Sequence, residues 1–217
     1  MKKNLTELVF ILDRSGSMYG LEQDTIGGFN SMLTKQKSLD GECRITTVLF
    51  DHQYTLFHDR IDIQAVSPMS EKDYFVGGST ALLDAIGTTI DKLIRVQRHT
   101  AESYRAQKVI FVIITDGEEN SSRKYSYDQV KAKIEHEKEA YGWEFIFLGA
   151  NMDAVKTASQ FGIHADRAAE YVPDAVGTTL NFEMMSNAVS EFRQCSTISD
   201  QHFETIRKDR KKRGDKR

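Results

Sequence analysis

The stretch Leu8-Val9-Phe10-Ile11-Leu12-Asp13-Arg14-Ser15-Gly16-Ser17 places a run of apolar residues directly before a short polar loop. The first five residues are β-branched, aromatic or aliphatic, with no polar interruption, which is typical of a strand buried on both faces. The acid Asp13 ends the run, and two serines follow it at alternate positions. Because a strand covered on both faces belongs to a mostly parallel sheet, this stretch predicts an α/β fold.

Three further apolar runs support this interpretation: Ile45–Phe50, Val109–Ile114 and Phe145–Leu148. Each is continuous rather than alternating, as expected for strands in the middle of a covered sheet. The segment Tyr54–Phe57 follows the second run across three polar residues. This spacing predicts a hairpin whose second strand is antiparallel and lies at an edge of the sheet.

Segments with helical spacing of apolar residues fill the gaps between these runs. They are Ile26–Leu33, Leu83–Ile94, Asp128–Ala140, Ala154–Phe161 and a long C-terminal stripe over about Val176–Phe203. Alternating strands and helices with right-handed crossovers predict a doubly wound, Rossmann-like α/β fold. We expect a mostly parallel six-stranded sheet with one antiparallel edge strand and helices on both faces. Residues 1–205 are expected to form a single domain, and 206–217 a disordered basic tail.

The composition is that of an ordinary globular chain: 217 residues, 40% hydrophobic and 28% charged. This excludes a fibrous repeat and disorder of the whole chain. No apolar run approaches the ~20 residues of a membrane span, and Leu8–Leu12 is too short for a secretion signal. The two cysteines, Cys43 and Cys195, are far apart and are expected to be free thiols in a reducing compartment. We therefore expect a cytoplasmic protein that does not bind membranes.

The net charge of −3 is unevenly distributed. Residues 207–217 contain eight basic and two acidic residues, so the remainder of the chain is strongly acidic. An acidic body disfavours nucleic acid, and only the basic tail could make weak contacts with phosphates. The simpler interpretation of the tail is a solvated terminus.

Polar residues follow or precede the buried elements in three separate segments. Besides Asp13–Ser17, these are Gly77-Gly78-Ser79-Thr80 before a helix and Thr115-Asp116-Gly117 after the third run. Doubly wound folds place their sites at the carboxyl ends of strands, so the three segments are expected to converge. Carboxylate and hydroxyl oxygens suit a hard cation such as Mg²⁺. Alternatively, the first segment holds only a helix cap and turn residues.

The motifs Asp13-x-Ser15-x-Ser17, Gly78–Leu82 and Ile114–Gly117, in this order, resemble the von Willebrand factor type A domain over roughly residues 5–200. The resemblance implies a metal-ion-dependent adhesion site (MIDAS) that holds Mg²⁺ or Mn²⁺ and keeps one coordination position open for an Asp or Glu of a protein partner. It also implies a C-terminal helix that shifts when the metal loops rearrange, with a static helix as the alternative. The metal ligands implied by the resemblance are Asp13, Ser15, Ser17, Thr80 and Asp116.

Several polar residues near these motifs have two interpretations. Thr80 is expected to cap the helix that follows it, and Asp84 either orients that loop or serves as a first-turn acid. Glu118 and Glu119 form either an acidic rim or part of a solvated loop. We also expect Asp13→Ala to leave the fold intact, because the acid is predicted to lie in a surface loop.

A second hypothesis for the function is an enzyme, namely a metal-dependent phosphohydrolase of the same fold class. A phosphatase with an aspartyl nucleophile needs a second acid two residues after Asp13, and Ser15 stands there. No phosphate loop, nucleophile elbow or HExxH motif occurs. Asp51 and His52 of the predicted hairpin lie at the same end of the sheet and could reach the site. We therefore expect a non-enzymatic binding module, monomeric outside its complex; a scaffold without metal is the third alternative.

Overall fold

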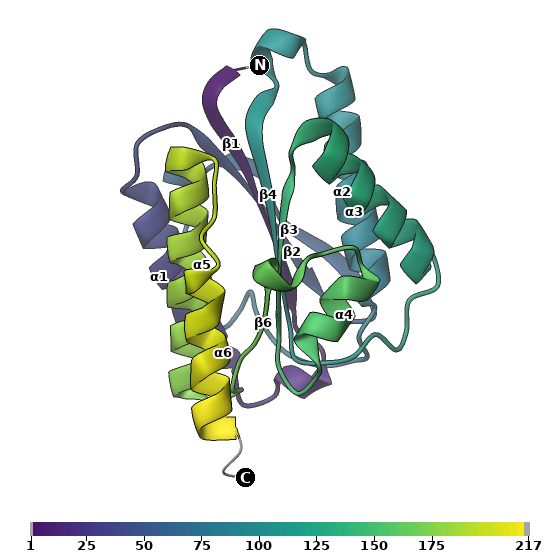
Figure 1. Cartoon of the computed structure of the whole chain (residues 1–217), viewed down its shortest axis with the longest axis vertical. Coiled ribbons are helices and arrows are strands. Elements are labelled where there is room, and N and C mark those ends of the chain that lie inside the picture. The colour runs from purple at the N-terminus through teal and green to yellow at the C-terminus, as the bar shows by residue number, and fades with distance from the viewer. Residues whose placement is uncertain (1, 215–217) are drawn as a thin grey trace.

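The computed structural model describes residues 2–214, which contain a six-stranded sheet of order β3-β2-β1-β4-β5-β6 (Figure 1). Neighbouring strands are parallel except for β2 and β3, so the predicted doubly wound sheet with an antiparallel edge strand is confirmed. The strands are β1 (Lys2–Asp13), β2 (Cys43–Phe50), β3 (Tyr54–Asp62), β4 (Ala106–Thr115), β5 (Glu144–Gly149) and β6 (Ala168–Glu170).

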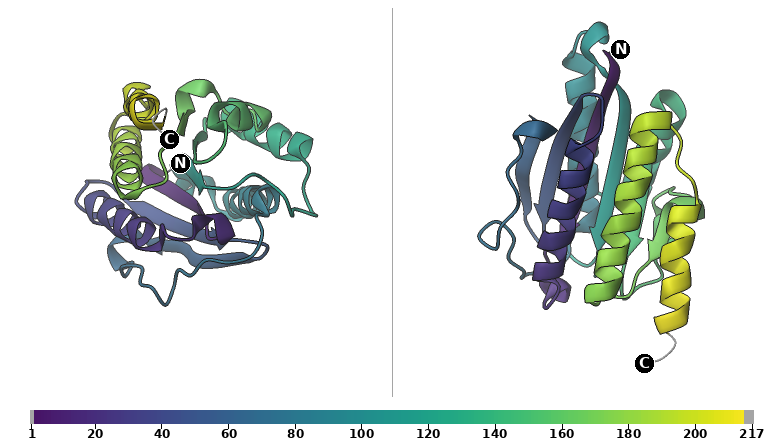
Figure 2. Two further views of the ribbon diagram at one scale, coloured as in Figure 1. Left: turned by 90° about the horizontal axis from the view of Figure 1, so that it is seen from below. Right: turned by 90° about the vertical axis from the view of Figure 1, so that its left-hand side faces the viewer.

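Helices cover both faces of the sheet (Figures 1 and 2). On one face lie α1 (Glu22–Lys37), α5 (Ala175–Cys195) and α6 (Gln201–Gly214). On the other lie α2 (Leu82–His99), α3 (Tyr127–Tyr141) and α4 (Ala154–Gln160). Short 3-10 turns are η1 (Gly16–Met18), η2 (Ile63–Ala65), η3 (Glu102–Tyr104) and η4 (Ala165–Arg167). No helix within the described residues is both long and apolar enough to cross a membrane.

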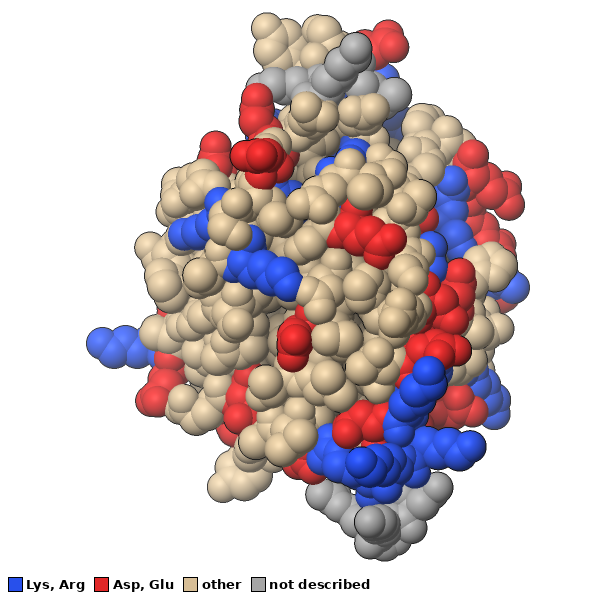
Figure 3. Space-filling model, turned by 60° about the vertical axis from the view of Figure 1, so that its left-hand side comes forward, with Lys and Arg blue, Asp and Glu red and all other residues tan. Residues whose placement is uncertain are grey.

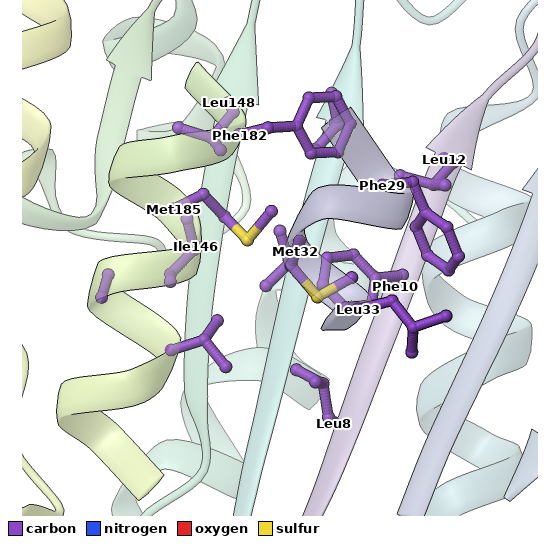
Figure 4. Packing of buried hydrophobic residues seen from close by; sticks show 14 of the residues in the cluster. Leu8, Phe10, Leu12, Phe29, Met32, Leu33, Ile146, Leu148, Phe182 and Met185 are labelled. Atoms are coloured by element: carbon purple, nitrogen blue, oxygen red, sulfur yellow. The ribbon is translucent and has the colours of Figure 1, made fainter. Parts of the chain in front are cut away.

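The continuous apolar run of β1 serves two separate cores. Leu8, Phe10 and Leu12 belong to the core under α1 and α5, whereas Val9 and Ile11 belong to the core under α2 and α3. Successive side chains of a strand point to opposite faces, so both faces of β1 need apolar residues. Figure 4 shows Leu8, Phe10 and Leu12 pointing from β1 toward α1.

The strand order places the candidate site. The chain moves outward from β1 to β2 and β3 on one side, and returns through β4, β5 and β6 on the other. The carboxyl ends of β1 and β4 are therefore neighbours at the point where the strand order reverses, with Leu12 paired to Ile114. Open α/β sheets bind ligands outside this point, at the lower edge of the sheet in Figure 1.

The C-terminal region differs from the expectation of one helix over Val176–Phe203. Helix α5 ends at Cys195, and Ser196 adopts a left-handed conformation with φ of 60°. A second helix, α6, starts at Gln201. A left-handed residue ends a helix by turning the chain out of the helical path, so the apolar stripe continues on a separate helix.

The expected disordered tail over 206–217 is also corrected. Residues 206–214 form the second half of α6, and 215–217 lie outside the described residues. Phe203 and Ile206 are fully buried in the core under α1 and α5. These two apolar anchors fix α6 on the body of the fold, although its other residues are mostly polar.

Candidate metal-binding site

Asp13 is the last residue of β1 and is only 1% exposed. Its Oδ1 accepts a hydrogen bond from the Ser15 amide at 2.6 Å, and its Oδ2 accepts one from Thr115 Oγ1 at 2.6 Å. The carboxylate thus ties the loop after β1 to the end of β4. The expectation that this acid lies in a surface loop is wrong, because the strand and its neighbour bury it.

Three hydroxyl groups converge beside Gly117. Ser15 Oγ and Ser17 Oγ lie 3.0 Å apart. A Cβ atom placed on Gly117 would lie 2.8 Å from Ser17 Oγ, 3.0 Å from Thr80 Oγ1 and 3.7 Å from Ser15 Oγ. Hydroxyls from two loops that are far apart in sequence therefore surround one point next to Asp116, and a side chain at position 117 would fill it.

Backbone contacts hold these loops together. The Gly16 amide donates to Gly78 O at 3.0 Å, and the Gly77 amide donates to Arg14 O at 2.9 Å. Gly78 has φ of 76°, and a Cβ there would collide with the His52 ring. Only glycine meets both the backbone conformation and the lack of space. The glycines before Thr80 therefore let this loop approach the loop after β1.

Asp116 follows β4 and is buried, and its Oδ1 accepts from Asn151 Nδ2 at 2.5 Å. Burial, together with the charge of Asp13, raises the pKa of Asp116 to about 6 despite the hydrogen bond from Asn151. Burial likewise raises the pKa of Asp13. No cation among the described residues contributes to either shift. Two buried carboxylates with no basic partner are costly, and a divalent cation would offset this cost.

The chemistry of these donors fits a hard cation. The convergent groups are two carboxylates and three hydroxyls, and oxygen ligands are those that Mg²⁺ and Mn²⁺ prefer. Within residues 2–214 no group of three or more His, Cys, Asp or Glu side chains could hold a metal. The three hydroxyls at Gly117 lie beside the buried acids Asp13 and Asp116, and oxygen groups of this kind suit such an ion.

Helix α2 is capped by a residue other than the one expected. The helix begins at Leu82, and Ala81 is its N-cap, so Thr80 lies outside it. Glu119 Oε2 accepts from the Leu83 amide at 2.8 Å, and Oε1 accepts from the Ser121 and Ser122 amides. Glu119 is thus half-buried and caps α2, whereas Glu118 is exposed.

Asp84 and Asp51 support loops around the site. The Asp84 carboxylate accepts from three consecutive amides, those of residues 123, 124 and 125, at 2.8–2.9 Å. It therefore fixes the loop after Asp116. Asp51 Oδ2 lies 3.2 Å from Arg14 Nε, and His52 Nδ1 lies 3.2 Å from Asp51 Oδ1. The hairpin acid thus holds Arg14 in place instead of joining the hydroxyl cluster.

Sequence reasoning missed three residues that contact the site. Thr115 binds Asp13, Asn151 binds Asp116, and Tyr74 OH donates to Asp13 O at 2.5 Å. Thr115 and Asn151 could have been found, since each stands at or just after the carboxyl end of a buried run. Tyr74 has no such signal, because it lies in an irregular loop between β3 and α2.

A scan of protein-family models and a search of curated proteins find no match for this chain. Solved structures do resemble it. Proximal thread matrix protein 1 from the mussel byssus, with a zinc-occupied MIDAS motif, gives a TM-score of 0.57 at 15% identity, covering 85% of this chain and 46% of that one. A von Willebrand factor type A protein from Catenulispora acidiphila gives 0.54 at 14% identity, covering 85% and 42%.

The manganese-loaded TRAP protein of Plasmodium vivax gives a TM-score of 0.51 at 20% identity, covering 69% of this chain and 58% of that one. The chain thus spans 42–58% of the length of these three structures. Identities of 14–20% show the fold and nothing finer. The conclusion from geometry and comparison together is that this chain has the fold of von Willebrand factor type A domains.

Proposed function

We propose that the chain is a metal-dependent protein-binding module. Asp13, Ser15, Ser17, Thr80 and Asp116 would hold Mg²⁺ or Mn²⁺, and a partner protein would supply an Asp or Glu side chain as a further ligand. The observation that carries the proposal is the convergence of three hydroxyls on Gly117 beside two buried carboxylates that lack a basic partner.

The residues present favour binding over hydrolysis. Three of the five groups are neutral hydroxyls, so a bound divalent cation would keep more attraction for an acidic side chain than it would among carboxylates alone. Thr115 and Asn151 orient the two carboxylates through hydrogen bonds of 2.6 and 2.5 Å. An aspartyl phosphatase would need its second acid at position 15. In this chain Ser15 stands there, and its Oγ is hydrogen-bonded to Ser17 Oγ at 3.0 Å. Support from outside comes from two neighbours that hold zinc or manganese.

The first test measures Mg²⁺ and Mn²⁺ affinity by titration calorimetry in wild type and Asp13→Asn. The substitution keeps the side-chain volume but removes the charge, and we expect affinity to fall by at least about tenfold. Glu118→Gln is the matched control, since it removes an exposed acid two residues from Asp116 and should bind as wild type. Equal affinity in Asp13→Asn and wild type would refute the metal assignment.

The second test addresses the partner. Proteins captured by the wild-type chain in Mg²⁺ are compared with those captured in EDTA and by Asp13→Asn. We expect a partner that is lost in both of the latter conditions and retained by Glu118→Gln. If the same proteins are captured in EDTA and by Asp13→Asn as by wild type in Mg²⁺, the partners bind elsewhere on the chain.

A further inference from the structure

Large apolar side chains are exposed around the candidate metal site. Tyr19 is 82% exposed at the end of η1, and Phe75 is 60% exposed in the loop before α2. Val176, at the start of α5, is 64% exposed. All three lie at the carboxyl edge of the sheet, where the three hydroxyls converge. Exposed apolar residues that gather at one place mark interaction sites, whereas single ones do not.

Tyr19 is held in an outward position by its neighbours. It comes two residues after Ser17, and its amide donates to Gly16 O at 3.3 Å. The preceding residue, Met18, is buried in the core under α1 and α5. Gly20, which follows, has φ of 89° and turns the chain toward α1. The buried methionine thus anchors the turn, and the tyrosine ring projects from it.

Phe75 is fixed in a similar way. The Arg14 guanidinium lies 4.9 Å from the centre of its ring, and Arg14 is itself held by Asp51 and by Thr55 Oγ1 at 3.0 Å. The preceding residue, Tyr74, is buried and donates to Asp13 O. The loop that presents Phe75 is therefore tied directly to the strand end that bears Asp13.

These two rings contribute little to the fold, and each follows a buried residue, Met18 or Tyr74, that fixes its backbone. Aromatic residues held in place lose little entropy on binding and are enriched among the residues that dominate interface energies. The Phe75 ring lies over the residue between Asp13 and Ser15, and Tyr19 follows Ser17 closely in the chain. Both aromatic residues therefore border the loop after β1 that carries Ser15 and Ser17.

We propose that Tyr19 and Phe75 form an apolar contact surface for a protein segment in which the metal-seeking acid is flanked by aliphatic or aromatic side chains. The inference rests on the proposed function, because the acid is what brings the segment to this edge. The metal ion would select only the acid of the partner, whereas the two rings would also select the residues on either side of that acid.

The test selects displayed random peptides on the full chain in Mg²⁺ and compares wild type with the double variant Tyr19→Ser/Phe75→Ser. The control is Tyr104→Ser/Tyr141→Ser, which removes two rings that are each 64% exposed at the opposite edge of the sheet. Wild type and control should select peptides with an acid beside aliphatic or aromatic residues. The double variant should bind those peptides at least about tenfold more weakly, with unchanged affinity for Mg²⁺ alone.

Other outcomes separate the two proposals. Metal-dependent acidic peptides without apolar neighbours, or peptides bound equally by the double variant, would overturn this inference and leave the metal function standing. Apolar peptides that need Tyr19 and Phe75 but bind equally in EDTA would refute the metal function and leave the apolar surface standing. A wild-type dimer that Tyr19→Ser/Phe75→Ser dissociates would assign the surface to a second copy of the chain and overturn the inference.

Discussion

Two fully buried side-chain amides in the α1–α5 layer differ in what they contact. Gln36 Nε2 donates to Ser186 O and Ser190 Oγ, and its Oε1 accepts from Arg193. Asn181 has no hydrogen-bond partner for either amide atom among the described residues. Gln36→Ala should therefore lower the free energy of unfolding by about 2–4 kcal/mol, whereas Asn181→Ala should change it by less than about 1 kcal/mol. Urea denaturation of both variants measures this difference; equal losses would contradict it.

Single residues also show how far the sequence could predict the site. Asp13, Ser15 and Ser17 could be chosen because they follow a recognisable buried run, and a strand end leads its loop to the ligand edge. Glu119 could not, since nothing in the sequence distinguishes it from the neighbouring Glu118. Only the folded chain brings the start of α2 to its carboxylate.

Among the elements, α2 depends on a cap supplied from another loop. Because Glu119 accepts from the amides of Leu83, Ser121 and Ser122, Glu119→Ala should lower the free energy of unfolding by about 1–2 kcal/mol. It should also weaken Mg²⁺ binding, since it loosens the loop that carries Thr80. Glu118→Ala is the control and should leave both quantities unchanged. The measurements are urea denaturation and calorimetry, and a Glu119→Ala protein as stable as the control would refute this role.

Strand β3 contains a buried histidine, His58, that makes the folded state less stable as the pH falls. His58 stacks on Phe29 and lies tilted against Phe57, and its Nδ1 lies 3.0 Å from Thr47 Oγ1. Burial lowers its pKa, although Asp73 opposes the shift. Below about pH 6.5 the unfolded chain therefore takes up a proton that the folded chain resists, and stability falls as pH falls, by at most about 1.4 kcal/mol per pH unit.

The variant His58→Gln should lose less stability between pH 7 and pH 5 than wild type does. Urea denaturation at each pH measures the loss. His164→Gln, at an exposed position, should follow the wild-type pH dependence. If His58→Gln and His164→Gln behave alike, the acid sensitivity comes from other groups.

The elements that the sequence did not predict are the ones with weak patterns. Strand β6 is Ala-Ala-Glu, which is too short to show any periodicity. Helix α6 is mostly charged, and two buried residues, Phe203 and Ile206, carry its packing. The break before it falls on Ser196, where glycine would have given the usual sign of a left-handed helix end. Long runs such as β1 and β4 were predictable because both of their faces are buried.

At the scale of the whole molecule, residues 207–214 of the basic C-terminal region belong to α6 and thus to the packed body. Arg207, Arg210 and Arg213 pair with Asp200, Glu170 and Asp174. Figure 3 shows basic side chains gathered beside acidic ones at one end of the molecule. Internal pairing reduces the charge available to an outside anion, so salt-dependent binding to nucleic acid through this region should be weak.

If α6 belongs to the core, its anchors must support global stability. Phe203→Ala should lower the free energy of unfolding by about 3–5 kcal/mol, since it removes a fully buried ring. Lys212→Ala on the same helix is exposed and should change it by less than about 0.5 kcal/mol. Thermal and urea denaturation provide the comparison. A Phe203→Ala protein as stable as Lys212→Ala would mean that α6 is only loosely attached.

Helix α6 also shields an open margin of the sheet. Strand β6 pairs with β5 on one side only, and Arg207 on its other side donates to the carbonyl oxygens of Ala165 and Ala168 at 3.0 Å. An unpaired strand margin is a template on which another chain can add a strand and begin a fibril. Arg207 occupies one carbonyl oxygen of β6, that of Ala168, which an incoming strand could otherwise use. The C-terminal helix therefore leaves an incoming strand less of this margin to pair with.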